Sequence, residues 1–161
     1  MFKQNLAKSA LLLAVPLIAA QARTVTVADH AERTMKDIQE SAYNVQNESE
    51  TLKTFATNME IDNQARAELL NSMRDRLNRM GKELALLEAE RSQLSLWEQQ
   101  ALDQTEPLLK DAAVNTEQVV EYFNAHKSPV WIGQYRDDTA RISNDTQKVV
   151  STLEASFKDS H

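Results

Sequence analysis

Few residues in the sequence are of the types that carry catalysis, and their spacing matches no catalytic pattern. The chain has no cysteine, which excludes a thiol nucleophile, a haem attachment motif and an iron–sulfur site. None of the three histidines, His30, His126 and His161, has an acidic residue three positions before it, so the Glu-x-x-His pairs of di-iron bundles are missing. The only glycines are Gly81 and Gly133, too few for a loop that binds phosphate. We therefore expect no catalytic residue, no cofactor and no metal site, and predict that the protein is not an enzyme.

Two pairs of neighbouring acids remain as candidates for acid–base chemistry. They are Glu88 with Glu90, and Asp137 with Asp138. The chain as a whole carries a formal net charge of −6, and outer helix faces are normally charged. We therefore interpret both pairs as solvated surface rather than as a site.

The tryptophans are the better candidates for function. Trp97 lies one position beside the apolar stripe described below. Trp131 and Ile132 fall at an expected helix tip that is more apolar than a solvated end needs. The ordinary interpretation is that these residues cap their own bundle. The functional one is a partner contact at Trp97, Trp131 and Ile132, because exposed aromatic patches tend to mark interfaces.

The element that positions these residues is a long helix over residues 69–101. Its apolar stripe advances by alternating steps of three and four residues, which is coiled-coil spacing. The stripe consists of Leu70, Met73, Leu77, Met80, Leu84, Leu87, Arg91, Leu94, Glu98 and Ala101. Such a stripe must be buried against other helices.

The preceding helix carries a matching stripe. Asp29 and Glu32 form a capping-box pattern at its start. Its stripe is Ala31, Met35, Ile38, Ala42, Val45, Ser49, Leu52, Ala56 and Met59. The pattern breaks at residues 60–63, which contain turn-forming Asp and Asn. A reversal there predicts an antiparallel hairpin in which paired residue numbers sum to 122, with Val45 opposite Leu77. It also brings Glu48 and Glu50 beside Arg74 and Arg76.

The next feature is Pro107, where a helix would normally stop or bend. The repeat continues through it, however, so we predict one long central helix over residues 63–127 that is kinked at Pro107. A last helix starts at Ser128–Pro129 and folds back so that paired numbers sum to 254. The predicted fold is all-α, with elongated antiparallel coiled-coil hairpins that share the central helix. The alternative is a true reversal at Pro107, which gives a compact four-helix bundle.

The N-terminus has the features of a secretory signal peptide. Lys3 and Lys8 flank an apolar run that is too short to span a bilayer and ends in Ala20-Gln21-Ala22. We expect residues 1–22 to be cleaved, residues 23–28 to be a disordered lead-in and residues 29–158 to form the helical domain. Cleavage removes two lysines and takes the net charge from −6 to −8, which disfavours nucleic acid and anionic membrane surfaces.

The resulting functional hypothesis is an exported, non-enzymatic coiled-coil protein, periplasmic or secreted, that acts through protein–protein contacts. It would serve as a spacer, adaptor or assembly factor in the cell envelope, with a protein partner or by self-association. It would bind no nucleic acid and would not insert into the membrane after cleavage. Two alternatives remain. One is a periplasmic holding chaperone, suggested by the methionine-rich stripe, and the other is a bundle that binds a lipid or small apolar ligand beside the weak Ala31–Ala56 stripe.

Overall fold

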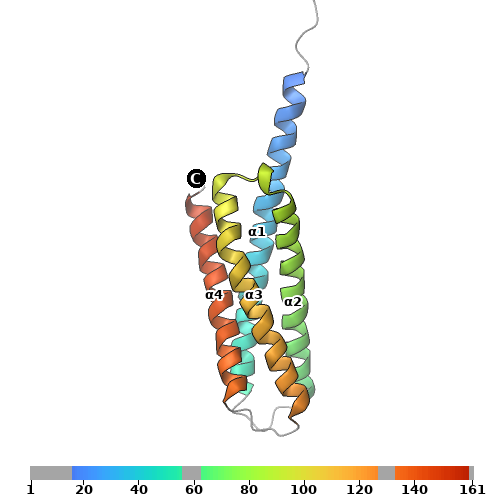
Figure 1. Ribbon diagram of the computed structural model, residues 1–161, viewed down its shortest axis with the longest axis vertical. Helices are drawn as coiled ribbons and strands as arrows, with labels where there is room; N and C mark the ends of the chain where they lie inside the picture. The colour runs from blue at the N-terminus through green and yellow to red at the C-terminus, as the bar shows by residue number, and fades with distance from the viewer. Residues whose placement is uncertain (1–15, 56–62, 127–132, 160–161) are drawn as a thin grey trace, which may run out of the picture.

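The computed structural model describes the backbone of residues 16–55, 63–126 and 133–159, and the side chains of these ranges between Asp29 and Lys158. Four α-helices make up most of the described chain (Figure 1): α1 (Pro16–Phe55), α2 (Asn63–Ala89), α3 (Leu96–Ala125) and α4 (Gln134–Asp159). A short 3₁₀ helix, η1 (Arg91–Gln93), lies between α2 and α3. No strand occurs in these ranges, and the all-α prediction is confirmed.

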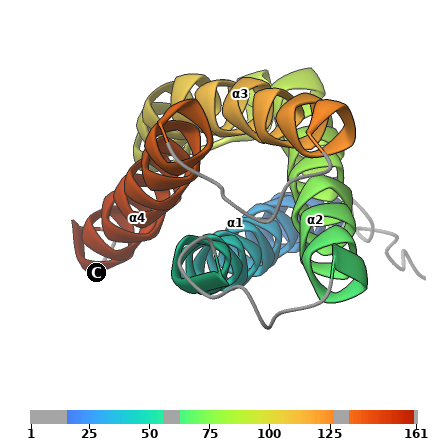
Figure 2. The same ribbon diagram turned by 90° about the horizontal axis from the view of Figure 1, so that it is seen from below.

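The helices form a four-helix bundle. Each helix packs on the next one along the chain, and α4 closes the ring against α1 (Figure 2). All four helices run roughly along the long axis of the bundle (Figure 1). Packing is most extensive between α4 and its two neighbours, and less extensive between α2 and its two neighbours. This difference leaves α2 as the helix with the loosest lateral support.

The central helix predicted over residues 63–127 is wrong, because the chain reverses between α2 and α3. Helix α2 ends at Ala89, and Ser95 caps the start of α3. The Ser95 amide donates to the Glu98 carboxylate at 2.6 Å, while the Glu98 amide donates to the Ser95 hydroxyl at 3.4 Å. This capping box satisfies amides that the first turn would otherwise leave unpaired. The two elongated hairpins sharing one helix are therefore replaced by a bundle.

Two ion pairs hold the reversal. The Arg91 guanidinium lies 3.0 Å from the Glu88 carboxylate and 2.8 Å from that of Asp103, so η1 is linked to both α2 and α3. Arg91 also lowers the pKa of Asp103 through this hydrogen bond. Pro107, where the compact alternative placed the turn, lies inside α3 with an exposed side chain. The structure does not confirm a kink there.

The predicted stripes of α1 and α2 form much of the core. The buried members are Ala31, Met35, Ile38, Ala42, Val45, Ser49, Leu52, Leu70, Met73, Leu77, Met80, Leu84 and Leu87. The repeat that continues through Pro107 predicts burial of Leu108 and Asn115, but in α3 the buried face is shifted by one position to Leu109 and Thr116. The reason is that α3 packs against two neighbours, α2 and α4, and a helix between two neighbours buries a wider face than a two-stranded seam.

The N-terminal part of α1 extends beyond the bundle (Figure 1). Residues 23–28, expected to be a disordered lead-in, are helical and continuous with the rest of α1. Of the predicted signal peptide, residues 1–15 lie outside the described residues. Within the described ranges, no helix combines the length and the apolar character needed to cross a membrane.

Candidate functional site

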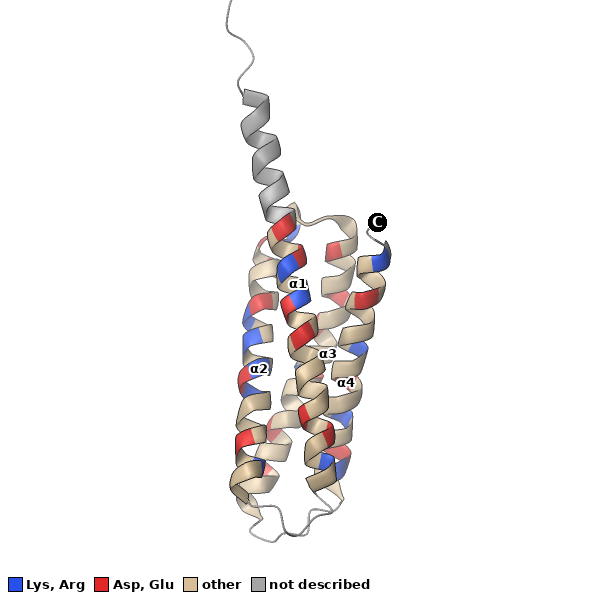
Figure 3. Cartoon of the chain, turned by 180° about the vertical axis from the view of Figure 1, so that it is seen from behind, with Lys and Arg blue, Asp and Glu red and all other residues tan. Residues whose placement is uncertain are grey.

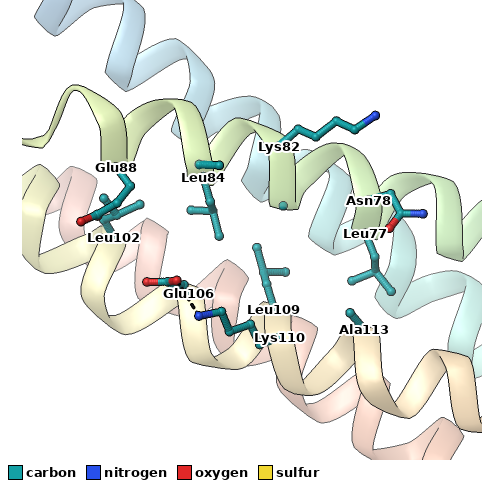
Figure 4. A pocket seen from close by; sticks show the side chains of 12 residues that line it. Leu77, Asn78, Lys82, Leu84, Glu88, Leu102, Glu106, Leu109, Lys110 and Ala113 are labelled. Atoms are coloured by element: carbon teal, nitrogen blue, oxygen red, sulfur yellow. Dashed lines mark ion pairs between the residues drawn. The ribbon is translucent and has the colours of Figure 1, made fainter.

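A groove of about 830 Å³ runs along the surface between α2 and α3 (Figure 4). Its floor is made by leucines that are only 2–7% exposed: Leu77 and Leu84 from α2, and Leu102 and Leu109 from α3. Leu77 and Leu84 point from α2 toward Leu109 of α3 (Figure 4). The groove therefore gives access from the surface to an apolar floor.

The spacing of the floor residues follows from the helical repeat. Leu77 and Leu84 are seven residues apart, as are Leu102 and Leu109, so each pair lies on one helix face two turns apart. Gly81 lies between the two α2 leucines and also lines the groove. A Cβ placed on Gly81 meets no atom within 4 Å. The missing side chain thus keeps the middle of the groove open, although glycine inside a helix costs about 1 kcal/mol relative to alanine.

The rim of the groove is polar, and some of its charged side chains already form ion pairs within the protein. On α3, the Lys110 ammonium lies 2.7 Å from the Glu106 carboxylate, and both side chains are substantially exposed. On α2, Glu88 pairs with Arg91 at 3.0 Å. Lys82 is exposed and points away from the groove floor (Figure 4). The rim therefore offers charges for recognition but no buried acid or base that faces the floor.

A second, smaller hollow of about 260 Å³ lies between α1 and α2 and is polar. Acidic and basic residues both occur along α1 and α2 (Figure 3). It is lined by Asp37, Glu40, Ser41 and Asn44 of α1, and by Arg76, Arg79 and Glu83 of α2.

Glu83 is the unusual residue of this hollow. Its Oε2 atom is buried without a hydrogen-bond partner among the described residues. Burial and the nearby charge of Asp37 raise the pKa of Glu83, and Arg79 opposes them. The hollow holds an energetically costly carboxylate rather than a ligand site.

Of the three residues predicted to contact a partner, one is described. Trp97 is half-buried on α3, and its ring meets that of Phe157 of α4 edge to face, with centroids 6.0 Å apart. Trp97 does not line the α2–α3 groove. Trp131 and Ile132 lie outside the described residues. A contact role for these residues stays a prediction.

One member of the acid pairs, Asp138, differs from the solvated surface that was expected. Glu88 is exposed and lines the groove, and Asp137 is exposed. Asp138 is only 2% exposed, and its Oδ1 atom lies 3.2 Å from Arg141. The surface interpretation is therefore wrong for Asp138. Its Oδ2 atom is buried without a hydrogen-bond partner among the described residues.

Asp138 shares α4 with Tyr135, one turn away, and both side chains are buried. Burial raises the pKa of Tyr135 to about 12, and the positive charge of Arg66 works in the opposite direction. Arg66 is itself 1% exposed and donates to the Phe55 carbonyl at 2.9 Å and to the Asn63 side chain at 3.2 Å. The bond to the Phe55 carbonyl fastens the end of α1 to the start of α2, which is a structural role that the sequence pattern did not reveal.

No group of three or more His, Cys, Asp or Glu side chains suited to a metal ion occurs in the described part of the chain. No protein-family model matches the chain, and no curated protein or solved structure matches it significantly. The α2–α3 groove is thus the feature on which a functional proposal rests.

Proposed function

We propose that this protein is an exported, non-enzymatic component of the cell envelope that acts by binding another protein. The observation that carries the proposal is the α2–α3 groove, where leucines of the core form a floor that is reachable from solvent. Accessible apolar surface with a polar rim is typical of interaction sites. Export rests on the signal-peptide pattern of residues 1–22.

The polar residues of the groove support binding rather than catalysis. A catalytic site needs a nucleophile or general base held near the reacting atoms by a second group. The carboxylates of Glu106 and Glu88 are instead paired with Lys110 and Arg91 at the rim. Such pairs are suited to matching the charges of a partner.

A lipid or small apolar ligand is the second candidate for the groove. A volume of about 830 Å³ falls within the range of roughly 300–1,000 Å³ for small-molecule sites. The groove lies between α2 and α3, however, rather than beside the α1 stripe, where such a ligand was first expected. There Ala31 and Ala42 are fully buried.

The holding chaperone receives less support. Its only sequence argument was the methionine-rich stripe, and Met35, Met73 and Met80 are at most 1% exposed. A client could reach them only if the bundle opened. We therefore favour a specific partner over a range of unfolded clients.

Site-specific photo-crosslinking in the original host tests the proposal. Ala85 lines the groove and is exposed, whereas Ala155 is exposed on α4 outside it. A photoreactive residue at position 85 should capture a protein in a discrete adduct, and the matched residue at position 155 should not. Adducts with lipid alone, equal adducts from both positions, or no adduct from position 85 would contradict the proposal.

A further inference from the structure

We infer that the α2–α3 groove receives an amphipathic helix of the partner protein, with acidic residues along the flank over α2 and basic residues along the flank over α3. The inference rests on the proposed function and specifies the partner. Two parallel rows of floor leucines, a groove with an open centre and rims of opposite sign support it together.

The floor has the shape and length that helix-in-groove recognition requires. Residues 77–88 of α2 and 102–113 of α3 line it, so it extends for about 16 Å at a rise of 1.5 Å per residue. This length corresponds to about three turns of a partner helix. Such a helix would present apolar residues at steps of three and four to the two rows of leucines. The open space beside Gly81 would accommodate its central side chain.

Glu88 at one end of the α2 rim is already paired with Arg91, and the charges that remain unpaired along the groove on α2 are basic. Arg74 lies one turn before Asn78, a lining residue, and Lys82 lies one turn after it, so all three follow one side of the helix. Arg74 is half-buried and donates to Asn71 at 3.3 Å, and Lys82 is exposed. Neither forms an ion pair with a described residue.

The α3 rim is acidic. Lys110, a basic lining residue of α3, is already paired with Glu106, and the unpaired charges that continue this side of α3 are acidic. Glu106 lines the groove, and Glu117 follows the lining residue Ala113 by one turn, with Glu121 a turn further on. Glu117 and Glu121 are exposed and form no ion pair with a described residue.

The two rims face each other without touching. Leu77 of α2 lies opposite Ala113 of α3 (Figure 4), and continuing this antiparallel alignment sets Arg74 near Glu117. These opposite charges nevertheless form no ion pair across the groove. An inserted helix with one acidic and one basic flank would pair with both rims at once. An acyl chain with one anionic head would use only the α2 rim and would be repelled by the carboxylates of α3.

Fluorescence anisotropy with designed peptides tests the inference. The probe is a labelled 18-residue amphipathic peptide, about five helical turns long. It carries leucines at alternating steps of three and four, glutamates along one flank and lysines along the other. Two further peptides keep the leucines but carry lysines on both flanks or glutamates on both flanks. A scrambled peptide of the same composition controls for non-specific binding. We expect the mixed-flank peptide to bind at least tenfold more tightly than each of the other three.

Substitutions at Gly81 show whether binding occurs in the groove. Gly81→Phe fills the open space and should weaken binding of the mixed-flank peptide at least tenfold. Gly81→Ala is the matched control, because it removes the same glycine but adds only a Cβ that contacts nothing. It should bind like the natural protein. Circular dichroism checks whether both variants keep their helices.

Charge reversal provides a second readout that does not depend on Gly81. The double variant Arg74→Glu/Lys82→Glu turns the α2 rim acidic and should shift the preference to the peptide with lysines on both flanks. An unchanged preference, or insensitivity to Gly81→Phe, overturns the inference. So does binding of dodecanoate that Gly81→Phe abolishes while no peptide binds.

The two proposals fail separately. A protein adduct from position 85 without binding of the mixed-flank peptide would refute the helical partner and leave protein binding intact. Adducts with lipid alone would refute both.

Discussion

The Glu83 carboxylate shows what it costs this bundle to bury a charged group. The Oε2 atom of Glu83 is buried without a hydrogen bond from the described residues, and Asp37 of α1 adds a second negative charge nearby. Arg79 offsets these effects only in part, so the pKa of Glu83 is raised above its ordinary value of 4.5. The neighbours Glu40 and Arg76 line the same hollow.

The raised pKa makes Glu83 a source of instability at neutral pH. The folded state binds the proton more tightly than the unfolded state, so stability falls as pH rises from 4.5 through the raised pKa. Glu83→Gln should therefore increase the melting temperature at pH 7. The difference between the variant and the natural protein should shrink as the pH is lowered toward 4.5. Thermal unfolding followed by circular dichroism at several pH values measures it, and a variant less stable at pH 7 would contradict the argument.

Of the charged residues inside the bundle, Glu98 belongs to the stripe that the sequence predicted to be buried, whereas the burial of the other two could not be predicted. Arg66, Glu98 and Asp138 are at most 2% exposed, yet charged residues in a helix normally lie on its solvated face. Their burial depends on partners: the Phe55 carbonyl for Arg66, the Ser95 cap for Glu98 and Arg141 for Asp138. For Glu98 the spacing Ser95-x-x-Glu98 was a usable signal of a helix start.

At the level of the elements, the position of the α2–α3 reversal results from local capping. The three-four repeat alone favoured an uninterrupted helix, because it keeps its phase through residues 91–101. The polar members of that stripe, Arg91 and Glu98, mark the interruption. Arg91 holds the turn and Glu98 completes the cap.

Removing the cap should weaken the bundle measurably. Ser95→Ala deletes the hydroxyl that accepts from the Glu98 amide. Loss of an N-cap side chain costs about 1 kcal/mol of unfolding free energy. The matched control is Ser92→Ala, because Ser92 is exposed in η1 three residues earlier and caps no helix. Urea denaturation compares the two, and equal stabilities would show that the capping box does not stabilise α3.

Pro107, unlike Ser95, is expected to destabilise α3. It lies inside α3, where it can donate no backbone hydrogen bond. Pro107→Ala should restore that donor and raise the unfolding free energy, by up to about 3 kcal/mol in an ideal helix and by less if the helix has adjusted. Gln104→Ala on the exposed face of the same helix controls for the gain from alanine itself. A clear loss of stability in Pro107→Ala would contradict this account.

The sequence predicted which residues of paired helices lie side by side better than it predicted how the four helices are arranged. The Glu48 carboxylate accepts from Ser72 at 2.7 Å and from Arg76 at 3.2 Å. The predicted sum of 122 pairs Glu48 with Arg74, which lies midway between these two residues. The residue numbers of Trp97 and Phe157, which are in contact, add up to the sum of 254 predicted for the last two helices. Glu50 was expected beside Arg74 and Arg76 of α2, but its carboxylate instead accepts from Ser143 of α4 at 2.8 Å. A repeat states which face is buried but not which helix covers it. The groove was likewise unpredictable, since it depends on how far α2 lies from α3.

For the whole molecule, the decisive interface is the one between α1 and α4, which no sequence pattern indicated. Hydrogen bonds and a cation–π contact cross it in addition to apolar packing. Besides the bond between Glu50 and Ser143, Gln39 donates to the Val150 carbonyl at 3.4 Å, and the Lys36 ammonium lies 5.6 Å from the centre of the Phe157 ring. Residues early in α1 thus meet residues late in α4, so the two helices run antiparallel. This interface closes the ring and makes the molecule a bundle rather than a rod.

A distance between spin labels on α1 and α4 separates these two architectures. Asn47 and Gln147 are exposed on adjacent helices of the bundle, whose axes should lie roughly 10 Å apart. In a rod with a shared central helix, the same residues would pair with positions 75 and 107 of that helix, about 48 Å apart at 1.5 Å per residue. Electron paramagnetic resonance on the doubly labelled protein should therefore give a short distance. Labels at Asn47 and Asp75 provide the control, because α1 and α2 are neighbours in both architectures. A short control distance together with a distance near 48 Å for Asn47 and Gln147 would exclude the bundle, and with it the α2–α3 groove.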